Sequence, residues 1–107
     1  MKTEFEDIKI ISVDDKATYK DGLKAALTHI VLNLSVSAPN KWANDFNQRW
    51  SQHIYTMKRK ASVYGKQLEI SCVPEELQEV HIPELNKVIA QTNQAYRQHL
   101  INARKSI

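Results

Sequence analysis

The chain has 107 residues, of which 42% are hydrophobic and 25% charged, and it carries a net charge of +3 and one cysteine. This length suits one domain and excludes a second core, so we expect a single domain over residues 1–107. The composition is typical of a folded chain and excludes disorder over most of its length. One cysteine excludes an internal disulfide, and a charge of +3 is modest for a dedicated nucleic-acid binder.

No segment has the pattern of a membrane-targeting sequence. The first seven residues alternate in charge and lack the apolar run of a secretory signal. The longest apolar run, residues 27–34, is interrupted by Thr28, His29 and Asn33, and it is far shorter than the roughly 20 residues that span a bilayer. Together with the single cysteine, these features predict a cytoplasmic protein with no membrane partner.

Two stretches in the first third of the chain have the pattern of strands. Residues 5–13 are rich in β-branched side chains, although the apolar residues change face after Ile10, which indicates a β-bulge. Residues 27–37 alternate between apolar and polar side chains, as in a strand with one buried face. Between them, Asp21-Gly22 is typical of a two-residue hairpin turn.

A helix is predicted after Pro39, because proline is tolerated in a first helical turn and Ser37 or Asn40 can cap the N-terminus. Five large apolar residues then follow at helical spacing and form one stripe: Trp42, Phe46, Trp50, Ile54 and Met57. We expect this helix to end near residues 58–60, where three cations suit the negative end of the helix dipole.

The second hairpin is the best-defined local element of the sequence. Residues 61–64 and 67–73 flank Gly65-Lys66, which fits a two-residue loop. The cross-strand pairs that this loop implies are Val63 with Leu68 and Ala61 with Ile70. Both pairs are apolar and fall on the same face, so the turn and the hydrophobic pattern predict the same register.

The last third of the chain is predicted to be helical. Pro74 begins a short helical turn, and Pro83 restarts or kinks the helix. The stripe that follows has spacings of three and four and consists of Leu85, Val88, Ile89, Thr92, Tyr96, His99 and Leu100. The order of elements predicts an α+β fold, ββαββα, with a four-stranded antiparallel sheet and two helices packed on one face.

The residue types that carry catalysis are present, but their spacing does not match a known site. The histidines, which have no zinc-like spacing with one another or with the cysteine, are His29, His53, His81 and His99. Cys72 falls on the same strand face as Leu68 and Ile70, which favours a place in the core. Glycine-rich phosphate loops and nucleophile elbows are missing. We expect no catalytic, cofactor-binding or metal-binding residues.

The basic residues and the tryptophans suggest two candidate surfaces. Lys58, Arg59 and Lys60 form the only basic run, and together with Arg97 of the last helix they make a candidate patch for a phosphate backbone. The alternative is a helix end decorated with lysine. Trp42 and Trp50 either both belong to the core or provide one exposed anchor at an interface.

These observations predict a small non-enzymatic interaction module, such as an adaptor, regulator or inhibitor of the bacterial or phage type. It would act by protein–protein binding, and a homodimer is a candidate state. The alternative is a nucleic-acid-binding protein that uses a basic helical face. A third alternative is an enzyme with an unconventional site around Asp14, Asp15 and the histidines, although an acidic pair of this kind more often marks a solvated strand end.

Overall fold

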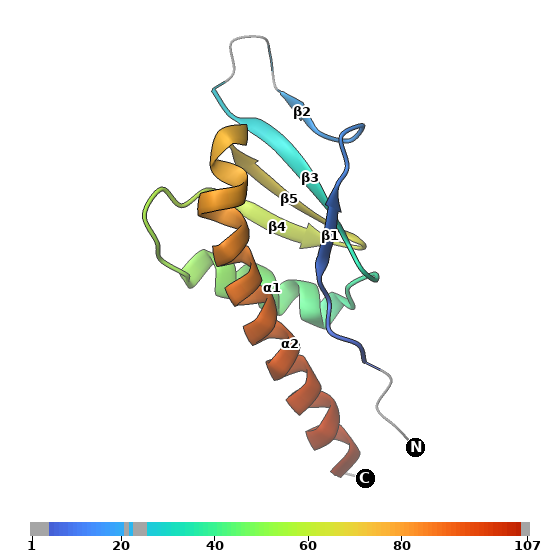
Figure 1. The fold of residues 1–107 in the computed structure, drawn as a ribbon. Helices are drawn as coiled ribbons and strands as arrows, with labels where there is room; N and C mark the ends of the chain where they lie inside the picture. Colours follow the sequence, from blue (N-terminus) through green and yellow to red (C-terminus); the bar gives the residue numbers. More distant parts are fainter. Residues whose placement is uncertain (1–4, 21, 23–25, 106–107) are drawn as a thin grey trace.

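We describe the protein from a computed structural model, which covers residues 5–20, 22 and 26–105, with side chains up to residue 103. The elements are β1 (Ile10–Val13), β2 (Tyr19–Lys20), β3 (Thr28–Leu34), α1 (Asn40–Gln52), β4 (Ala61–Tyr64), β5 (Gln67–Cys72), a 3₁₀ turn (Pro74–Glu76), a π-helical turn (Leu77–His81) and α2 (Ile82–Lys105) (Figure 1). The predicted α+β class and the ββαββα-like order are confirmed.

The strands form one antiparallel sheet in the order β1-β3-β5-β4. A fifth strand, the two-residue β2, pairs with β3 beyond the end of β1 and was not among the four predicted strands. The register of the second hairpin is the predicted one, with Val63 opposite Leu68 and Ala61 opposite Ile70. The bulge predicted in the first strand is also confirmed, because the register with β3 shifts between Ile10 and Ser12.

The hairpin turn predicted at Asp21-Gly22 lies partly outside the described residues, which include Gly22 but not Asp21. The described strands on either side pair with Lys20 opposite Thr28, which is not the register that a two-residue turn at these positions would give.

The first helix is shorter than its apolar spacing predicted. It begins at Asn40 after Pro39, without a side-chain cap, and it ends at Gln52 because His53 is extended. Ile54, predicted for the buried stripe, is 90% exposed. Met57 is also exposed and has a positive φ of 67°, which no helix contains. The spacing of these two residues therefore continued the pattern by coincidence.

The core lies between the sheet and the two helices. It joins apolar side chains of β3, β4 and β5 with those of α1 and α2 in one cluster. Trp42, Phe46 and Trp50 lie along α1 with nearly parallel rings, and the successive ring centroids are 5.7 and 6.2 Å apart. Trp42 is 0% and Trp50 2% exposed, so neither is the exposed anchor that one of the two interpretations predicted, and both belong to the core.

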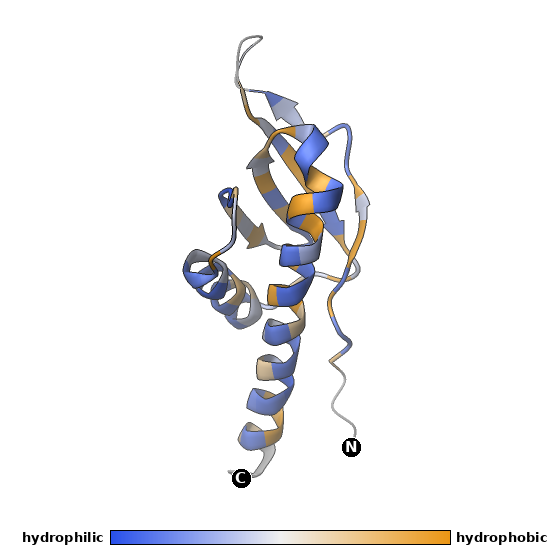
Figure 2. Cartoon of the chain, turned by 60° about the vertical axis from the view of Figure 1, so that its left-hand side comes forward, coloured by the Kyte–Doolittle hydropathy of each residue, from blue (hydrophilic) through white to orange (hydrophobic). Residues whose placement is uncertain are grey.

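Helix α2 crosses the sheet and continues beyond it (Figure 1). Hydrophobic residues gather in the part of α2 that crosses the sheet, whereas hydrophilic residues dominate beyond it (Figure 2). Among the described helices, none combines the length and the apolar character that crossing a bilayer requires.

The extended segment before β1 is held to α2 by one buried side chain, Asn93. The Asn93 Oδ1 atom accepts hydrogen bonds from Ile8 N and from Trp42 Nε1, both at 3.0 Å. Its Nδ2 atom donates to Ile8 O, also at 3.0 Å. One amide therefore satisfies both backbone groups of Ile8 and the indole of Trp42, all of which are buried.

Candidate binding site at the edge of the sheet

Strand β4 forms one edge of the sheet, next to α1. In an antiparallel edge strand, the N–H and C=O of one residue face the neighbouring strand and those of the next residue point outward. Lys60 O accepts a hydrogen bond from Ser71 N at 3.0 Å, so the even-numbered residues face β5. The backbone groups of Ala61 and Val63 therefore point outward, away from β5.

Two side chains of α1 cover this outer edge at either side of Ala61. Asn47 Oδ1 accepts a hydrogen bond from Val63 N at 2.8 Å, and Asn47 Nδ2 donates to Val63 O at 3.3 Å. Trp50 Nε1 donates to Arg59 O at 3.0 Å. The side chains of residues 47 and 50 are three positions apart and lie on the same side of the helix. They protect the edge strand as a neighbouring strand would.

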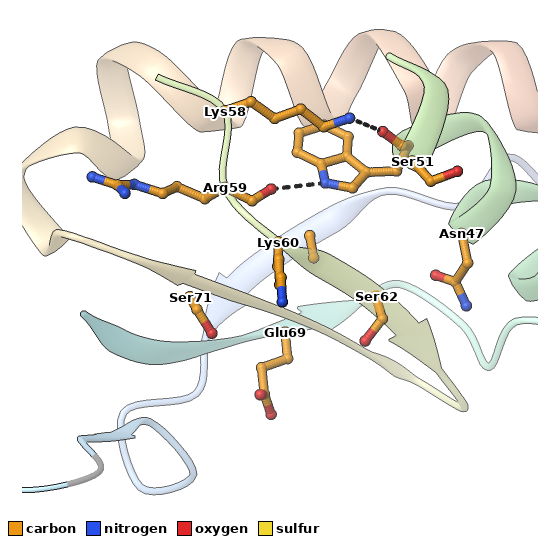
Figure 3. A pocket seen from close by; sticks show the side chains of 10 residues that line it. Asn47, Ser51, Lys58, Arg59, Lys60, Ser62, Glu69 and Ser71 are labelled. Atoms are coloured by element: carbon orange, nitrogen blue, oxygen red, sulfur yellow. Dashed lines mark hydrogen bonds between the residues drawn. The ribbon is translucent and has the colours of Figure 1, made fainter. Parts of the chain in front are cut away.

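Ala61 lies between these two covered positions, at an open hollow of about 600 Å³ that we call the edge hollow (Figure 3). The edge hollow is lined by Asn47, Trp50, Ser51, residues 58–62, Glu69 and Ser71. None of the hydrogen bonds formed by the described side chains reaches the backbone of Ala61. The strand thus offers one donor and one acceptor to an incoming ligand.

The three cations of the basic run have different roles. Lys58 Nζ donates to Trp50 O and His53 O at the C-terminus of α1, and it lies 5.5 Å from the Trp50 ring centroid. The Arg59 guanidinium is paired with Glu76 at 3.3 Å and points away from the edge hollow (Figure 3). Lys60 is exposed and forms no ion pair within the part of the chain that the structure describes. Of these three cations, Lys60 is therefore the one available to a ligand.

The predicted basic patch is not assembled. Arg97 lines a different hollow, together with residues 7–9 and further residues of α2. It is paired with Asp7 and lies 5.7 Å from the Phe5 ring centroid. Of the four candidate residues, the structure brings Lys58, Arg59 and Lys60 to the edge hollow and keeps Arg97 at another place. The four predicted residues therefore do not line one common hollow.

A chain of hydrogen bonds joins Tyr55, His81 and Glu76 at the junction of the 3₁₀ and π-helical turns. His81 is fully buried, with its Nδ1 atom 2.7 Å from the Tyr55 hydroxyl and its Nε2 atom 3.0 Å from Glu76 Oε1. Because an ionised carboxylate only accepts, His81 Nε2 donates a hydrogen bond to Glu76. In the neutral ring, Nδ1 then accepts a hydrogen bond from the Tyr55 hydroxyl. Burial raises the pKa of Tyr55 to about 12, so its hydroxyl stays protonated.

Two of the other residues considered for chemistry, Cys72 and Asp14, have structural roles. Cys72 is buried in the core as predicted, and burial raises the pKa of its thiol to about 11. Asp14 Oδ1 accepts a hydrogen bond from Ala17 N at 3.2 Å, which makes it a turn residue at the end of β1. Within the described residues, no group of three or more His, Cys, Asp or Glu side chains is arranged to hold a metal ion.

Glu76 is expected to make the protein sensitive to acid. The hydrogen bond from His81, followed by that from Arg59, holds the pKa of the Glu76 carboxyl below its usual 4.5. A depressed pKa in the folded state adds stability above the unfolded pKa, and this stability is lost as the pH falls through the folded value. We expect the free energy of unfolding to decrease as the pH is lowered below about 4.5.

Urea denaturation at a series of pH values measures this dependence. Glu76→Gln should flatten the loss of stability in acid, whereas Glu75→Gln, at the exposed neighbouring position, should keep the wild-type slope. Equal slopes for Glu76→Gln and the wild type would contradict the ion-pair role of Glu76.

In comparisons with protein-family models, curated proteins and solved structures, the chain matches none of them significantly.

Proposed function

We propose that this protein is a non-enzymatic interaction module that binds an extended segment of a partner protein by adding it as a strand to the edge of β4. The observation that carries this proposal is the uncovered backbone of Ala61 at the edge hollow, between two positions that Asn47 and Trp50 cover. In strand addition, backbone hydrogen bonds supply affinity and side-chain pockets supply specificity. The edge hollow provides both elements.

The geometry of β4 restricts how such a segment binds. Asn47 already bonds the outward backbone groups of Val63, and the Trp50 indole already bonds the carbonyl of Arg59. One residue of the partner is therefore expected to pair with Ala61 through two hydrogen bonds. A contact of this size favours weak, reversible binding, as in transient signalling encounters. An adaptor or regulator that exchanges partners fits this behaviour.

The chemistry of the buried groups supports binding rather than catalysis. The two side chains best suited to act as nucleophiles, Cys72 and Tyr55, have pKa values raised to about 11 and about 12 and stay protonated near neutral pH. A buried, reduced thiol also agrees with action in the cytoplasm, which we include in the proposal.

Selection from a phage-displayed library of random linear dodecapeptides tests the proposal. We expect enriched peptides whose addition shifts the backbone amide NMR signals of Ala61 and Ser62 and leaves those of β2 unchanged. Ala61→Pro should weaken the binding of these peptides at least about tenfold, because proline lacks the backbone N–H that Ala61 offers to the peptide. Its fold should persist, since an edge strand tolerates proline where the N–H points outward.

A library that yields no peptide perturbing Ala61 would overturn the proposal, and so would peptides that bind the Ala61→Pro variant as tightly as the wild type. If the variant fails to fold, the NMR shifts on the wild-type protein decide the question. A homodimer paired through β4, detected by light scattering, would also overturn it, because the edge would then be occupied by a second copy.

A further inference from the structure

We infer that the bound segment carries an acidic side chain at the position opposite Lys60, next to an apolar residue at the position opposite Ala61. The inference rests on the proposed function and adds the chemistry by which the partner is recognised. It follows from three features of β4: the alternation of its faces, the single available cation and the position of Glu69.

The alternation of faces assigns the side chains of the bound segment. Val63 is buried against the helices, so Ala61, two positions away, has the same orientation. Lys60 and Ser62 therefore point to the opposite, helix-free face, where Ser71 and Glu69 lie. Because paired residues of neighbouring strands share a face, the partner residue opposite Ala61 turns toward Trp50 and its neighbours turn toward Lys60 and Ser62.

The position opposite Ala61 favours an apolar side chain. The edge hollow is lined by residues of both β4 and α1, and the apolar residue Trp50 is among them. Asn47 and Ser51 lie on the helix side, whereas Ser62, Glu69 and Ser71 lie on the other (Figure 3). A small or medium apolar side chain gains contact area here without burying a charge.

The neighbouring position favours a negative charge. Lys58 and Arg59 are engaged by backbone carbonyls and by Glu76, so Lys60 alone is available to a ligand. The Lys60 side chain extends on the same side as Glu69 (Figure 3). Opposite charges that face each other across neighbouring strands attract, which gives a carboxylate opposite Lys60 a favourable partner.

The apolar residue of the bound segment has two neighbours, one opposite Lys60 and one opposite Ser62. The position of Glu69 indicates which of the two is acidic and which kind of anion binds there. Glu69 lies on β5 opposite Ser62, and its carboxylate accepts a hydrogen bond from the Tyr64 hydroxyl at 3.3 Å and lies 3.3 Å from His29 Nδ1. A carboxylate of the bound segment opposite Ser62 would therefore lie one strand away from a negative charge and would meet no cation on β4. The acidic residue is therefore expected on the Lys60 side. A phosphate group carries close to two negative charges, which one lysine beside Glu69 does not balance, so the structure favours a carboxylate.

Repeating the dodecapeptide selection on Lys60→Glu tests this inference, with Lys66→Glu as the control. Lys66 is an exposed lysine in the turn between β4 and β5, so its substitution makes the same change in net charge away from the edge hollow. Wild type and Lys66→Glu should both enrich an apolar residue followed or preceded by Asp or Glu. Lys60→Glu should lose this preference.

Peptides selected on the wild type give the quantitative test. We expect about threefold weaker binding to Lys60→Gln and about tenfold weaker binding to Lys60→Glu, and affinity that decreases with added salt. Peptides that bind at Ala61 without an acidic preference, or that bind Lys60→Gln as tightly as the wild type, would overturn the inference and leave the proposed function standing. The absence of any peptide at Ala61 instead refutes the proposed function.

Discussion

Replacing Asn93 with alanine is expected to destabilise the protein by about 4 kcal/mol, the largest effect of any single substitution proposed for it. The substitution removes the partner of three polar groups: Ile8 N, Ile8 O and Trp42 Nε1. Each buried group that loses its partner costs about 1–3 kcal/mol. Against a typical stability of about 5–15 kcal/mol, this loss leaves a marginal fold.

Urea denaturation of Asn93→Ala measures this effect, and two further variants separate hydrogen bonding from packing. Asn93→Asp keeps the size and the acceptor but loses the donor to Ile8 O, so we expect it to be destabilised by at least about 2 kcal/mol. Asn86→Ala removes an exposed asparagine from the same helix and should change stability by less than about 0.5 kcal/mol. An Asn93→Asp variant as stable as the wild type would refute the hydrogen-bonding account.

Replacing Asn47 with alanine is expected to cost about 2 kcal/mol and to lengthen the open edge of β4. The substitution frees the N–H and C=O of Val63, which Asn47 now covers. The expected cost is smaller than at Asn93 because the neighbouring edge hollow admits water to the freed groups. The outward N–H and C=O groups of both Ala61 and Val63 would then lack a hydrogen-bond partner within the described residues.

The longer edge of Asn47→Ala predicts a second change besides lower stability. Uncovered edge strands pair with other chains, so this variant should self-associate at concentrations where the wild type does not. Analytical ultracentrifugation measures this difference. Asn44→Ala, an exposed asparagine on the same helix, is the control and should match the wild type in both stability and mass. An Asn47→Ala variant that stays as stable and as monomeric as its control would contradict the covering role.

The sequence was most informative where local turn chemistry and hydrophobic pattern agreed. Gly65-Lys66 and the flanking alternation predicted the register of β4 and β5 correctly. The helical spacing also predicted the buried residues of α2 correctly from Leu85 to Thr92, whereas His99, which was predicted for the same stripe, is exposed. Helix α1 was extended too far because Ile54 and Met57 keep the helical spacing, whereas the capping of the helix end by Lys58 is not visible in a periodic pattern.

The candidate site was only partly predictable. The basic run pointed to residues 58–60, but the pairing of Arg59 with Glu76 depends on a contact that sequence spacing does not encode. Asn47 and Asn93 looked like ordinary polar helix residues. Their only signal was position: Asn47 is three residues before the buried Trp50, and Asn93 is four residues after the buried Ile89. A polar side chain beside an apolar stripe requires a partner. Here the partners were backbone groups of extended segments, together with the Trp42 indole in the case of Asn93.

The exchange rate of the Ala61 amide hydrogen, measured by NMR in D₂O, tests most directly whether β4 is open at this one residue. In the free protein, we expect Ala61 to exchange roughly a hundredfold faster than Ser62, which pairs with β5, and Val63, which Asn47 holds. Adding a selected peptide should slow Ala61 to the rate of its neighbours. An Ala61 amide that is as protected as Val63 before any peptide is added would contradict the account.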